Sequence, residues 1–556
     1  MSFCQDGKVC RFWKWFAVVI AAALIEIGMI GSYEGAAEAR APHKATQTKA
    51  LHGKGTILFV PQDDRPTSRE QSADAVEKLG YTVLMPPKDL LGGLAAGQPD
   101  ALWQWAEAQA TQADAAVVST DSIIYGGLVA SRKHELSEEE LAERVDRVAQ
   151  LKRLNPNMKI YAFGSLMRTP ASGPASGGEE PDYYMTYGEQ IFRKSGLLDK
   201  QEMRGLTYSE KQELTALRDT IPAGVWDDWM GRREKNFAVT EKLIDFARQG
   251  TLDVFVLGKD DNAPLSATHQ ESRKLAQSSA DVPQTRFQML AGIDEFGMLL
   301  LARAVNDFSH TVPLVNIEYN WGVGGAMVPD YSDETIAHSI KADLLIAGAV
   351  AVPDPAKADL VLLVNTPPDG HMGYGNLPDN DGASGSDRFD PKSFAAFAQG
   401  FVDAGQRVVI ADITRTNGAD NALMNALRDR ALLFRLYGYA GWNTATNSVG
   451  FALGQGMLNV RLPDAAVDRL LLDRYLDDWG YQSNVRTQVT EQLSWLQDTN
   501  VYLNLGRYEA ATQLRVTRLL RQFAAENLPP IPGVDHLEFT FPWHRMFIGG
   551  ITVPEK

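Results

Sequence analysis

Short apolar stretches that run directly into carboxylates, amides or arginine recur along this chain, and they constrain its fold more than any other feature. Each stretch has the length and the flanking residues of a buried strand. In α/β proteins the loops after such strands converge on one edge of the sheet, where ligands bind. The pattern therefore predicts one polar pocket with several carboxylates. The five stretches are Ile57–Val60 before Gln62, Ala115–Val118 before Ser119, Val254–Leu257 before Lys259, Phe287–Leu290 before Gly292, and Leu314–Ile317 before Glu318.

Helical segments with an apolar period of 3.6 residues alternate with these strands. Examples are residues 69–79 and 100–110, and a capping box opens another helix at Ser137. Strands separated by helices indicate mostly parallel sheets that helices cover on both faces. The sequence therefore predicts an α/β fold, either as two α/β domains or as a (β/α)₈-like barrel plus a second α/β domain, with a helical C-terminal region.

The expected domain organisation follows the same alternation. An N-terminal α/β domain is predicted over residues 55–330, with an insertion over 169–249 that starts rich in Pro, Gly and Ser. Such an insertion after a strand is typical of a lid or a small subdomain. A second α/β domain is predicted over 331–460, and a helical region with a terminal strand over 461–556. The sequence has no evident internal repeat.

Residues 1–40 have the features of an export signal. Three basic residues at positions 8–14 precede an apolar run over 16–30, and an Ala-Glu-Ala stretch follows at 37–39. Glu26 interrupts the apolar run, so an uncleaved membrane anchor is the alternative to a signal peptide. Either interpretation predicts a periplasmic or secreted protein. Cys4 and Cys10 both lie in this segment, which leaves the remainder without a thiol for a disulfide, a nucleophile or a metal site.

The charge of the chain narrows the classes of partner. A formal net charge of −16 disfavours binding to nucleic acids or to anionic membranes, because phosphates would be repelled. Contact with a membrane is therefore expected only through the N-terminal segment. The expected ligand is a small polar or carbohydrate substrate, and no cofactor is predicted.

Two of the strand ends suggest specific chemistry. Asp63, Asp64 and Arg65 follow the first strand, where the arginine can bind an acidic ligand or hold Asp63 ionised. The alternative is a structural loop in which an aspartate caps the next helix. The second of these strand ends carries Asp260 and Asp261, which come shortly after Val254–Leu257.

Two further acids adjoin a predicted helix. Asp294 and Glu295 precede a helix that is expected to start at Phe296. One acid of the pair suits the helix dipole, and the other is left for chemistry.

Several of these motifs together resemble a bacterial family known only as domain of unknown function 4127. The resemblance spans residues 56–550 and implies that the loops act together, but it brings no assigned reaction. The motifs are residues 61–66, 125–132 with Asp121, 260–264, 441–444 and 541–547.

Carboxylates, amides and aromatic rings at strand ends favour a glycosidase-like hydrolase, since that reaction needs two carboxylates and no cofactor. The predicted catalytic residues are Asp121, Asp261 and Glu295, as acid/base or nucleophile. The predicted substrate-binding residues are Asp63, Asp64, Arg65, Tyr125, Arg132, Asp260, Asn262, Glu318, Asn417, Trp442 and Asn443.

Two alternatives remain from the sequence. The first is a divalent-metal-dependent hydrolase of a phosphate, amide or ester, with Asp63, Asp260, Asp261 and His269 among the ligands. The second is a periplasmic binding protein for a polar solute, which would use the same loops without turnover.

Overall fold

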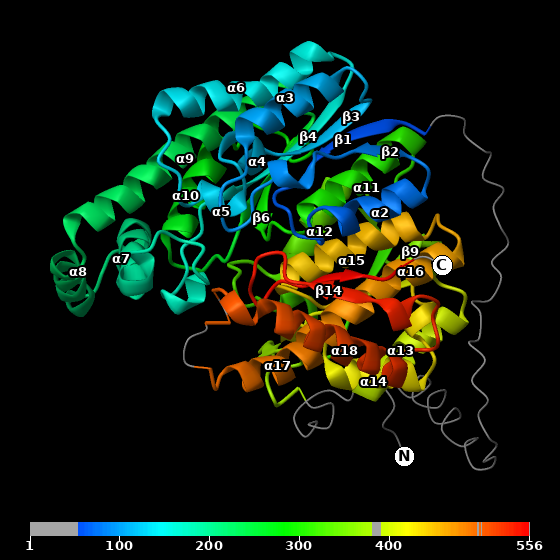
Figure 1. Ribbon diagram of the computed structural model, residues 1–556. Coiled ribbons are helices and arrows are strands. Elements are labelled where there is room, and N and C mark those ends of the chain that lie inside the picture. Colours follow the sequence, from blue (N-terminus) through cyan, green and yellow to red (C-terminus); the bar gives the residue numbers. More distant parts are fainter. Residues whose placement is uncertain (1–53, 381–390, 497–499, 502, 555–556) are drawn as a thin grey trace, which may run out of the picture. The chain divides into compact units, whose positions relative to one another are not determined.

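Two open parallel sheets form the core of the computed structural model, which describes residues 54–380, 391–496, 500–501 and 503–554 (Figure 1). The first sheet has the strand order β2-β1-β3-β4-β5-β6 and the second β13-β11-β9-β7-β8. The predicted α/β class is confirmed, and the first sheet ends at the edge strands β2 and β6 instead of closing into a barrel. The strands are β1 (Thr56–Val60), β2 (Thr82–Leu84), β3 (Ala115–Ser119), β4 (Lys159–Leu166), β5 (Val254–Lys259), β6 (Phe287–Ala291), β7 (Leu314–Tyr319), β8 (Val350–Ala351), β9 (Leu360–Asn365), β11 (Val408–Asp412) and β13 (Gly438–Ala440).

The second sheet repeats the strand order of the first. In each sheet the second strand along the chain lies at an edge beside the first strand, and the later strands follow on the other side of the first. The order therefore reverses between β1 and β3 in one sheet and between β7 and β9 in the other. Such switch points open a crevice at the carboxyl ends of the strands, where ligands bind in this class of fold.

Helices cover both faces of the first sheet because its strands are apolar on both sides. Leu58 and Val60 pack with α3 (Pro99–Ala110), α6 (Glu138–Leu154) and α9 (Ala223–Gln249). Ile57 and Phe59, which point the opposite way, pack with the layer that contains α2 (Glu70–Lys78) and α11 (Phe296–Ser309). This alternation is the two-residue side-chain period of a strand.

The two sheets share a central helical layer of α11 and α15 (Ala445–Asn459) (Figure 1). Ten of the 14 residues of α11 and all 15 residues of α15 are buried, as expected of helices with apolar neighbours on most sides. Glycines permit the close contact. A Cβ atom at Gly450 would lie 2.5 Å from Cγ of Glu295, and one at Gly454 would lie 2.7 Å from Cγ of Met298.

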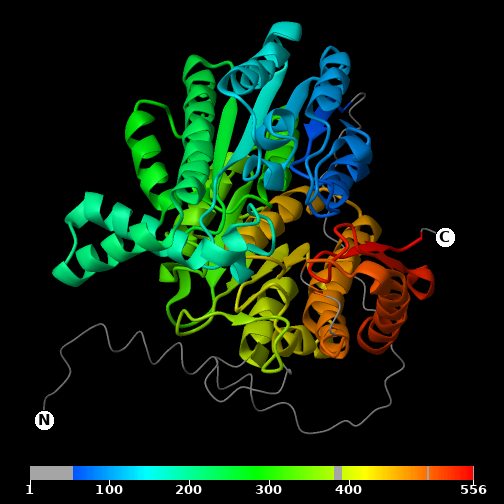
Figure 2. The same ribbon diagram turned by 60° about the vertical axis from the view of Figure 1, so that its left-hand side comes forward.

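The insertion over residues 169–249 forms a helical arm with its own small core. Tyr184, Ile191 and Trp229 are buried together there. Figure 2 shows α7 and α8 projecting away from the sheets. The arm consists of α7 (Tyr184–Arg204), α8 (Tyr208–Thr220) and the first part of α9.

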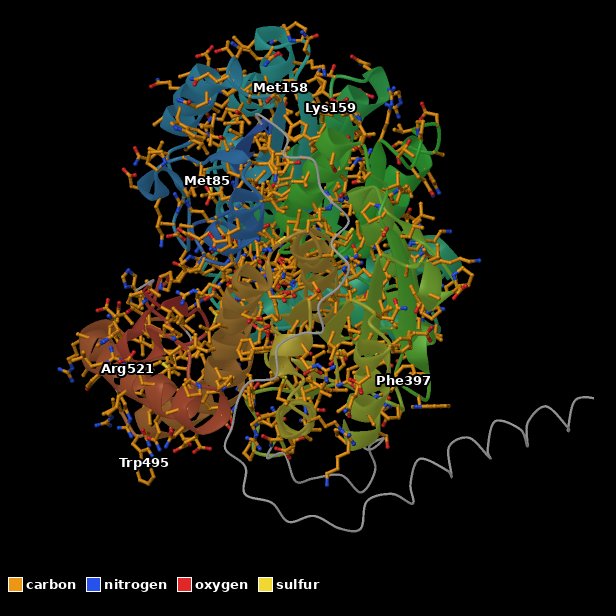
Figure 3. All side chains as sticks on the ribbon, turned by 90° about the vertical axis from the view of Figure 1, so that its right-hand side faces the viewer. Met85, Met158, Lys159, Phe397, Trp495 and Arg521 are labelled. Carbon is orange, nitrogen blue, oxygen red and sulfur yellow. The ribbon has the colours of Figure 1, made fainter. Side chains whose placement is uncertain are left out.

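The C-terminal region is largely helical, as predicted, and ends in a hairpin. A π-helical stretch, Tyr475–Val485, continues α16 (Asp464–Arg474) into α17 (Arg486–Leu493). Trp495 follows α17, is 84% exposed and points away from the body of the protein (Figure 3). The remaining elements of the region are α18 (Glu509–Asn527), β14 (Glu538–Thr540) and β15 (Gly550–Thr552).

None of the helices in the described ranges combines the length and the apolar character that a membrane span requires. The predicted export signal lies outside the described residues. Shorter elements complete the described chain. They are α4 (Thr120–Ile124), α5 (Leu128–Ser131), α10 (Ala267–Ser278), α12 (Ile336–Ala347), α13 (Pro391–Asp403), α14 (Asn421–Asp429), β10 (Gly373–Tyr374) and β12 (Arg415–Thr416).

One strand lies in a different sheet from the one that the expected domain boundary implies. β7 pairs with β8 and β9 of the second sheet, although the boundary near residue 330 assigned it to the first domain. Sequence spacing cannot reveal this, because β7 has the same apolar pattern and the same polar exit as the strands before it.

Candidate functional site

A pocket of about 470 Å³ lies where the loops after both sheets meet the C-terminal segment. Loops after β1, β5 and β6 form one wall, and loops after β12 and β13 form another. Its lining includes five arginines and four carboxylates, together with amides and aromatic rings. The charged and amide residues are Arg65, Arg132, Arg168, Arg486, Arg545, Glu179, Asp260, Asp261, Asp294, Asn376, Asn417 and Asn443.

Asp294 is held by side chains from both sheets. The Arg65 guanidinium donates to Asp294 Oδ1 at 2.6 Å and to Asp63 Oδ2 at 2.6 Å. The side-chain amides of Gln62 and Asn443 also donate to the Asp294 carboxylate. Burial raises the pKa of Asp294, and the Arg65 charge opposes that rise. The result is a fully hydrogen-bonded carboxylate at the pocket wall.

A second cluster surrounds Asp261. The Arg168 guanidinium donates to Asp261 Oδ2 at 2.5 Å and to Glu180 Oε1 at 2.9 Å. Arg132 bonds to Asp260. Burial, with the charge of Asp260, raises the pKa of Asp261 to about 6. A carboxyl group with such a pKa can hold a proton near neutral pH, as a general acid requires.

Glu179, in the loop before α7, offsets part of the positive charge of this cluster. It accepts hydrogen bonds from Arg132 at 3.0 Å and from Arg545 at 2.5 Å. Burial would raise its pKa, but the charges of Arg545, Arg168 and Arg132 hold the pKa well below its usual value. Glu179 is therefore ionised and fixes three guanidinium groups in place.

Backbone strain concentrates at this pocket. Among the described residues, seven other than glycine have a left-handed φ, and four of these line the pocket. They are Asp261 at 40°, Tyr331 at 65°, Asn417 at 59° and Asn443 at 70°. Non-glycine residues pay a steric penalty in this region, and such residues cluster at functional sites. The clustering supports a binding or catalytic role for this pocket.

The loops with Asn417 and Asn443 support each other. The Asn417 amide donates to the Asn443 carbonyl at 2.9 Å. From the π-helical stretch, Asp478 Oδ2 accepts from the Gly441 amide at 2.8 Å. Arg486 donates to the Asn417 carbonyl at 3.0 Å. A π-helical segment beside a functional loop is a frequent arrangement, because it re-aims side chains that a regular helix would place elsewhere.

The structure brings together some of the residues predicted from the sequence and separates others. Arg65, Arg132, Asp260, Asp261, Asn417 and Asn443 line the pocket. Asp63 and Asp64 lie directly behind it, bonded to Arg65 and Trp543.

Asp121 and Glu295 are not among the residues that line the pocket. Asp121 is buried, accepts hydrogen bonds from the amide and the hydroxyl of Ser165, and has its pKa raised by burial to about 7. Glu295 has no exposed surface and packs against α15. Of the three predicted catalytic residues, Asp261 alone borders the pocket.

Four predicted binding residues also lie away from the lining. Tyr125 stacks on His134 with ring centroids 4.9 Å apart, and Asn262 accepts from the Ala263 amide at 2.8 Å in the turn before α10. Trp442 is buried in an apolar cluster with Trp543, and Glu318 lies within β7.

Several lining residues were not selected from the sequence. Arg168 follows β4, and Glu179 lies in the insertion, which was interpreted only as a lid or subdomain. Arg545 lies in the C-terminal motif 541–547, which was noted only for its resemblance to a family. Asp294 was not among the predicted site residues, because its neighbour Glu295 was chosen from the acid pair as the catalytic candidate. The two adjacent acids before a predicted helix indicated that one of them could belong to the site. The sequence does not show which of the two side chains points into the pocket.

The metal ligands predicted as an alternative do not come together. His269 Nδ1 lies 2.6 Å from Asp199 Oδ2 of α7, and Arg273 donates to the other oxygen of the same carboxylate at 2.6 Å. In the described part of the chain, no three His, Cys, Asp or Glu residues are grouped so that they could hold a metal ion.

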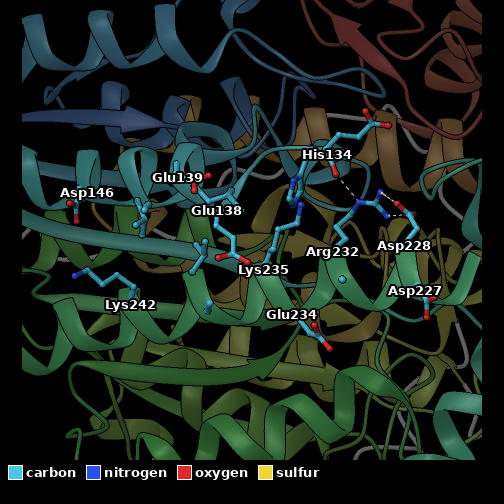
Figure 4. A pocket seen from close by; sticks show the side chains of 17 residues that line it. His134, Glu138, Glu139, Asp146, Asp227, Asp228, Arg232, Glu234, Lys235 and Lys242 are labelled. Carbon is cyan, nitrogen blue, oxygen red and sulfur yellow. Dashed lines mark hydrogen bonds and ion pairs between the residues drawn. The ribbon is translucent and has the colours of Figure 1, made fainter. Parts of the chain in front are cut away.

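A second cavity, of about 1010 Å³, lies between α6 and α9 (Figure 4). Charged side chains line it, and Arg232 donates to Asp228 at 2.9 Å and to the His134 carbonyl at 2.8 Å. This groove lies on the outer helical layer, and its lining contains none of the predicted catalytic residues Asp121, Asp261 and Glu295. We therefore place the candidate site in the smaller pocket at the strand ends.

Comparison with known proteins adds a family but no reaction. No curated protein matches the chain. A family model described as "Protein of unknown function (DUF4127)" matches residues 57–552, which is nearly the whole chain and includes every residue of the pocket. The chain therefore belongs to the DUF4127 family.

Proposed function

We propose that this protein is an exported carbohydrate-active hydrolase of glycosidase type. The observation that supports this most is the pairing of two unlike carboxylates in one pocket. Burial raises the pKa of both carboxyl groups, to about 6 for Asp261, but the oxygens of Asp294 accept hydrogen bonds from Arg65, Gln62 and Asn443, which favour its ionised form. Hydrolysis of a glycosidic bond needs one carboxyl group that gives a proton and one that stays ionised.

In the proposed reaction, Asp261 gives its proton to the glycosidic oxygen as the bond from that oxygen to the sugar carbon breaks. The ionised Asp294 stabilises the positive charge that develops on the sugar ring. One water is added across the broken bond, its hydroxyl to the sugar carbon, and its remaining proton returns to Asp261. Amides of Asn417 and Asn443, which line the same pocket, suit the hydroxyl groups of such a substrate.

Export is part of the proposal because of the N-terminal sequence. The basic and apolar segments over residues 8–30 favour a periplasmic or secreted protein. A hydrolase without a cofactor is compatible with export as an unfolded chain.

A second candidate is a binding protein for a polar solute. It is favoured by the repeated strand order of the two sheets and by a pocket whose lining comes from both. Such a protein would bind the same ligands without converting them, so turnover separates the two candidates.

The test is hydrolysis of a panel of aryl glycosides and peptidoglycan-derived sugars, with and without EDTA. Asp261→Asn and Asp294→Asn are compared with Asp281→Asn, an exposed aspartate that pairs with Arg248 on the outer surface. Turnover that persists in EDTA and in Asp281→Asn, but not in the two pocket variants, supports the proposal. Turnover that EDTA abolishes favours the metal-dependent hydrolase, and saturable binding without turnover favours the binding protein.

A further inference from the structure

An exposed aromatic rim adjoins the pocket on the side of the second sheet. Tyr331, Tyr374 and Leu377 line the pocket and are 38%, 36% and 45% exposed. The two tyrosine hydroxyls lie 3.2 Å apart. The three side chains therefore form a surface that continues from the pocket to solvent.

The backbone fixes this rim to the candidate site. Tyr331 has a φ of 65°, and its carbonyl accepts from the Asn262 amide at 3.1 Å, next to Asp261. Tyr374 lies in β10 and pairs with Thr416 of β12, directly before Asn417. The rings are therefore held by the same loops that hold the pocket side chains, and little entropy would be lost when a ligand binds to them.

Exposed apolar side chains are concentrated around the rim. Of the fourteen large hydrophobic residues that are exposed in the described part of the chain, six lie in the loops 320–331 and 367–380. The two loops are joined, because the Val323 amide donates to the Pro368 carbonyl at 3.0 Å. Grouped exposed apolar surface beside a pocket is typical of a binding surface, whereas single exposed residues need no explanation. The six residues are Trp321, Val323, Val328, Tyr331, Tyr374 and Leu377.

The chemistry of the rim differs from that of the pocket. Hydrogen-bonding and charged groups dominate the pocket, while the rim offers aromatic faces with hydroxyl groups at their edges. A pyranose ring has the matching character, since its C–H groups stack on an aromatic face and its hydroxyls reach polar neighbours. A nucleic acid could also stack, but the net charge of −16 would repel its phosphates.

We propose that the rim of Tyr331, Tyr374 and Leu377 is a second sugar subsite, so that the substrate is a chain of sugar units instead of a single glycoside. One unit lies in the pocket beside Asp261 and Asp294, and the next unit stacks on the tyrosines. This inference rests on the proposed function and specifies its substrate class.

The experiment measures kcat/KM for aryl glycosides and for series of β- and α-linked oligosaccharides of increasing length, including peptidoglycan-derived glycans. The rim variants are Tyr374→Ala and Tyr331→Gly, the second because glycine accepts the left-handed backbone. Tyr208→Ala, on the helical arm with 77% exposure, is the matched control. Circular dichroism and thermal unfolding verify that each variant folds.

For the wild type, we expect kcat/KM to rise from the shortest to the longer chains. Each rim variant should lose about 10- to 100-fold on the longer chains, the usual range for the loss of a stacking contact, and little on the shortest. The Tyr208→Ala control should match the wild type at every length.

Three outcomes would overturn the inference in distinguishable ways. Equal losses on short and long substrates would make the rim a structural element. Turnover of aryl glycosides without any gain from chain length would remove the second subsite and leave the proposed function standing. Absence of turnover on every sugar would remove the proposed function itself.

Discussion

The indole nitrogen of Trp543 donates a hydrogen bond to Asp64 Oδ1 at 2.7 Å and joins residues that are 479 positions apart. Asp64 follows the first strand of the chain, and Trp543 follows the last helix. The Trp543 ring also lies 5.0 Å from the Arg65 guanidinium and 5.0 Å from that of Arg545. The C-terminal segment therefore completes the wall of a pocket that the N-terminal loops begin.

Trp543→Phe should weaken this closure while keeping most of the packing. Asp64 is half-buried, and loss of its indole donor leaves a carboxylate with poorer solvation than in the unfolded chain. We expect the free energy of unfolding in urea to fall by about 1 kcal/mol. Trp495→Phe, at an exposed position, is the control and should leave the free energy of unfolding unchanged. Equal free energies of unfolding for the two variants would show that the Trp543 hydrogen bond makes no net contribution to stability.

Asp260→Asn should change the pH dependence of activity. In the proposed reaction Asp261 acts in its protonated form, so kcat/KM should fall as pH rises through about 6. The Asp260 charge raises the pKa of Asp261, and its removal lowers that pKa. The alkaline limb of the pH profile should therefore move to lower pH in the variant. A limb that stays in place, or moves to higher pH, would contradict Asp261 as the acid.

Glu295→Gln should make stability less sensitive to pH. Burial, with the nearby charge of Asp343, raises the pKa of Glu295 well above its usual value of 4.5, so the folded protein retains a proton that the unfolded chain releases. Wild-type stability should therefore fall, relative to the variant, as pH rises above about 4.5, by at most roughly 1.4 kcal/mol per pH unit. Urea unfolding at several pH values measures the difference.

The exposed Glu241→Gln is the control for that comparison, since its carboxyl group is solvated in both states. A pH-independent difference between wild type and Glu295→Gln would mean that Glu295 is ionised in the folded protein.

Gly450→Ala should destabilise the layer between the two sheets. The added Cβ would lie 2.5 Å from Cγ and 2.9 Å from Cβ of Glu295, too close without a shift of α11 or α15. Overpacking of this kind costs about 1–3 kcal/mol. Gly400→Ala in α13 has no atom within 4 Å of the added Cβ and should be neutral or slightly stabilising. Similar thermal unfolding of the two variants would argue against tight packing between the helices.

Much of the fold follows from the sequence because strands and helices here have strong local patterns. The stretch Ile57–Val60 lies within β1, and the capping box at Ser137 opens α6, as predicted. Short strands such as β8 and β10 were not predicted, because two residues give no periodicity. The repeated strand order is also invisible in the sequence, since topology depends on which strands pair.

The candidate site was predictable in outline but not in detail. The fold places residues that follow parallel strands at one edge of the sheet. This is why Arg65, Asp261 and Asn443 could be predicted as site residues. The side chain that faces the pocket at a given strand end depends on a local turn of the backbone, as Asp294 and Glu295 illustrate. Residues from the insertion and the C-terminus, such as Glu179 and Arg545, join the site only through tertiary packing.

Turnover of sugar substrates by the purified protein and its Asp261→Asn and Asp294→Asn variants tests the central claim most directly. Removing a general acid or the ionised carboxylate should lower kcat by at least about 10²- to 10⁴-fold, while folding and Asp281→Asn activity remain unchanged. Wild-type hydrolysis that disappears in both pocket variants is the predicted result. Hydrolysis that both variants retain would contradict the account.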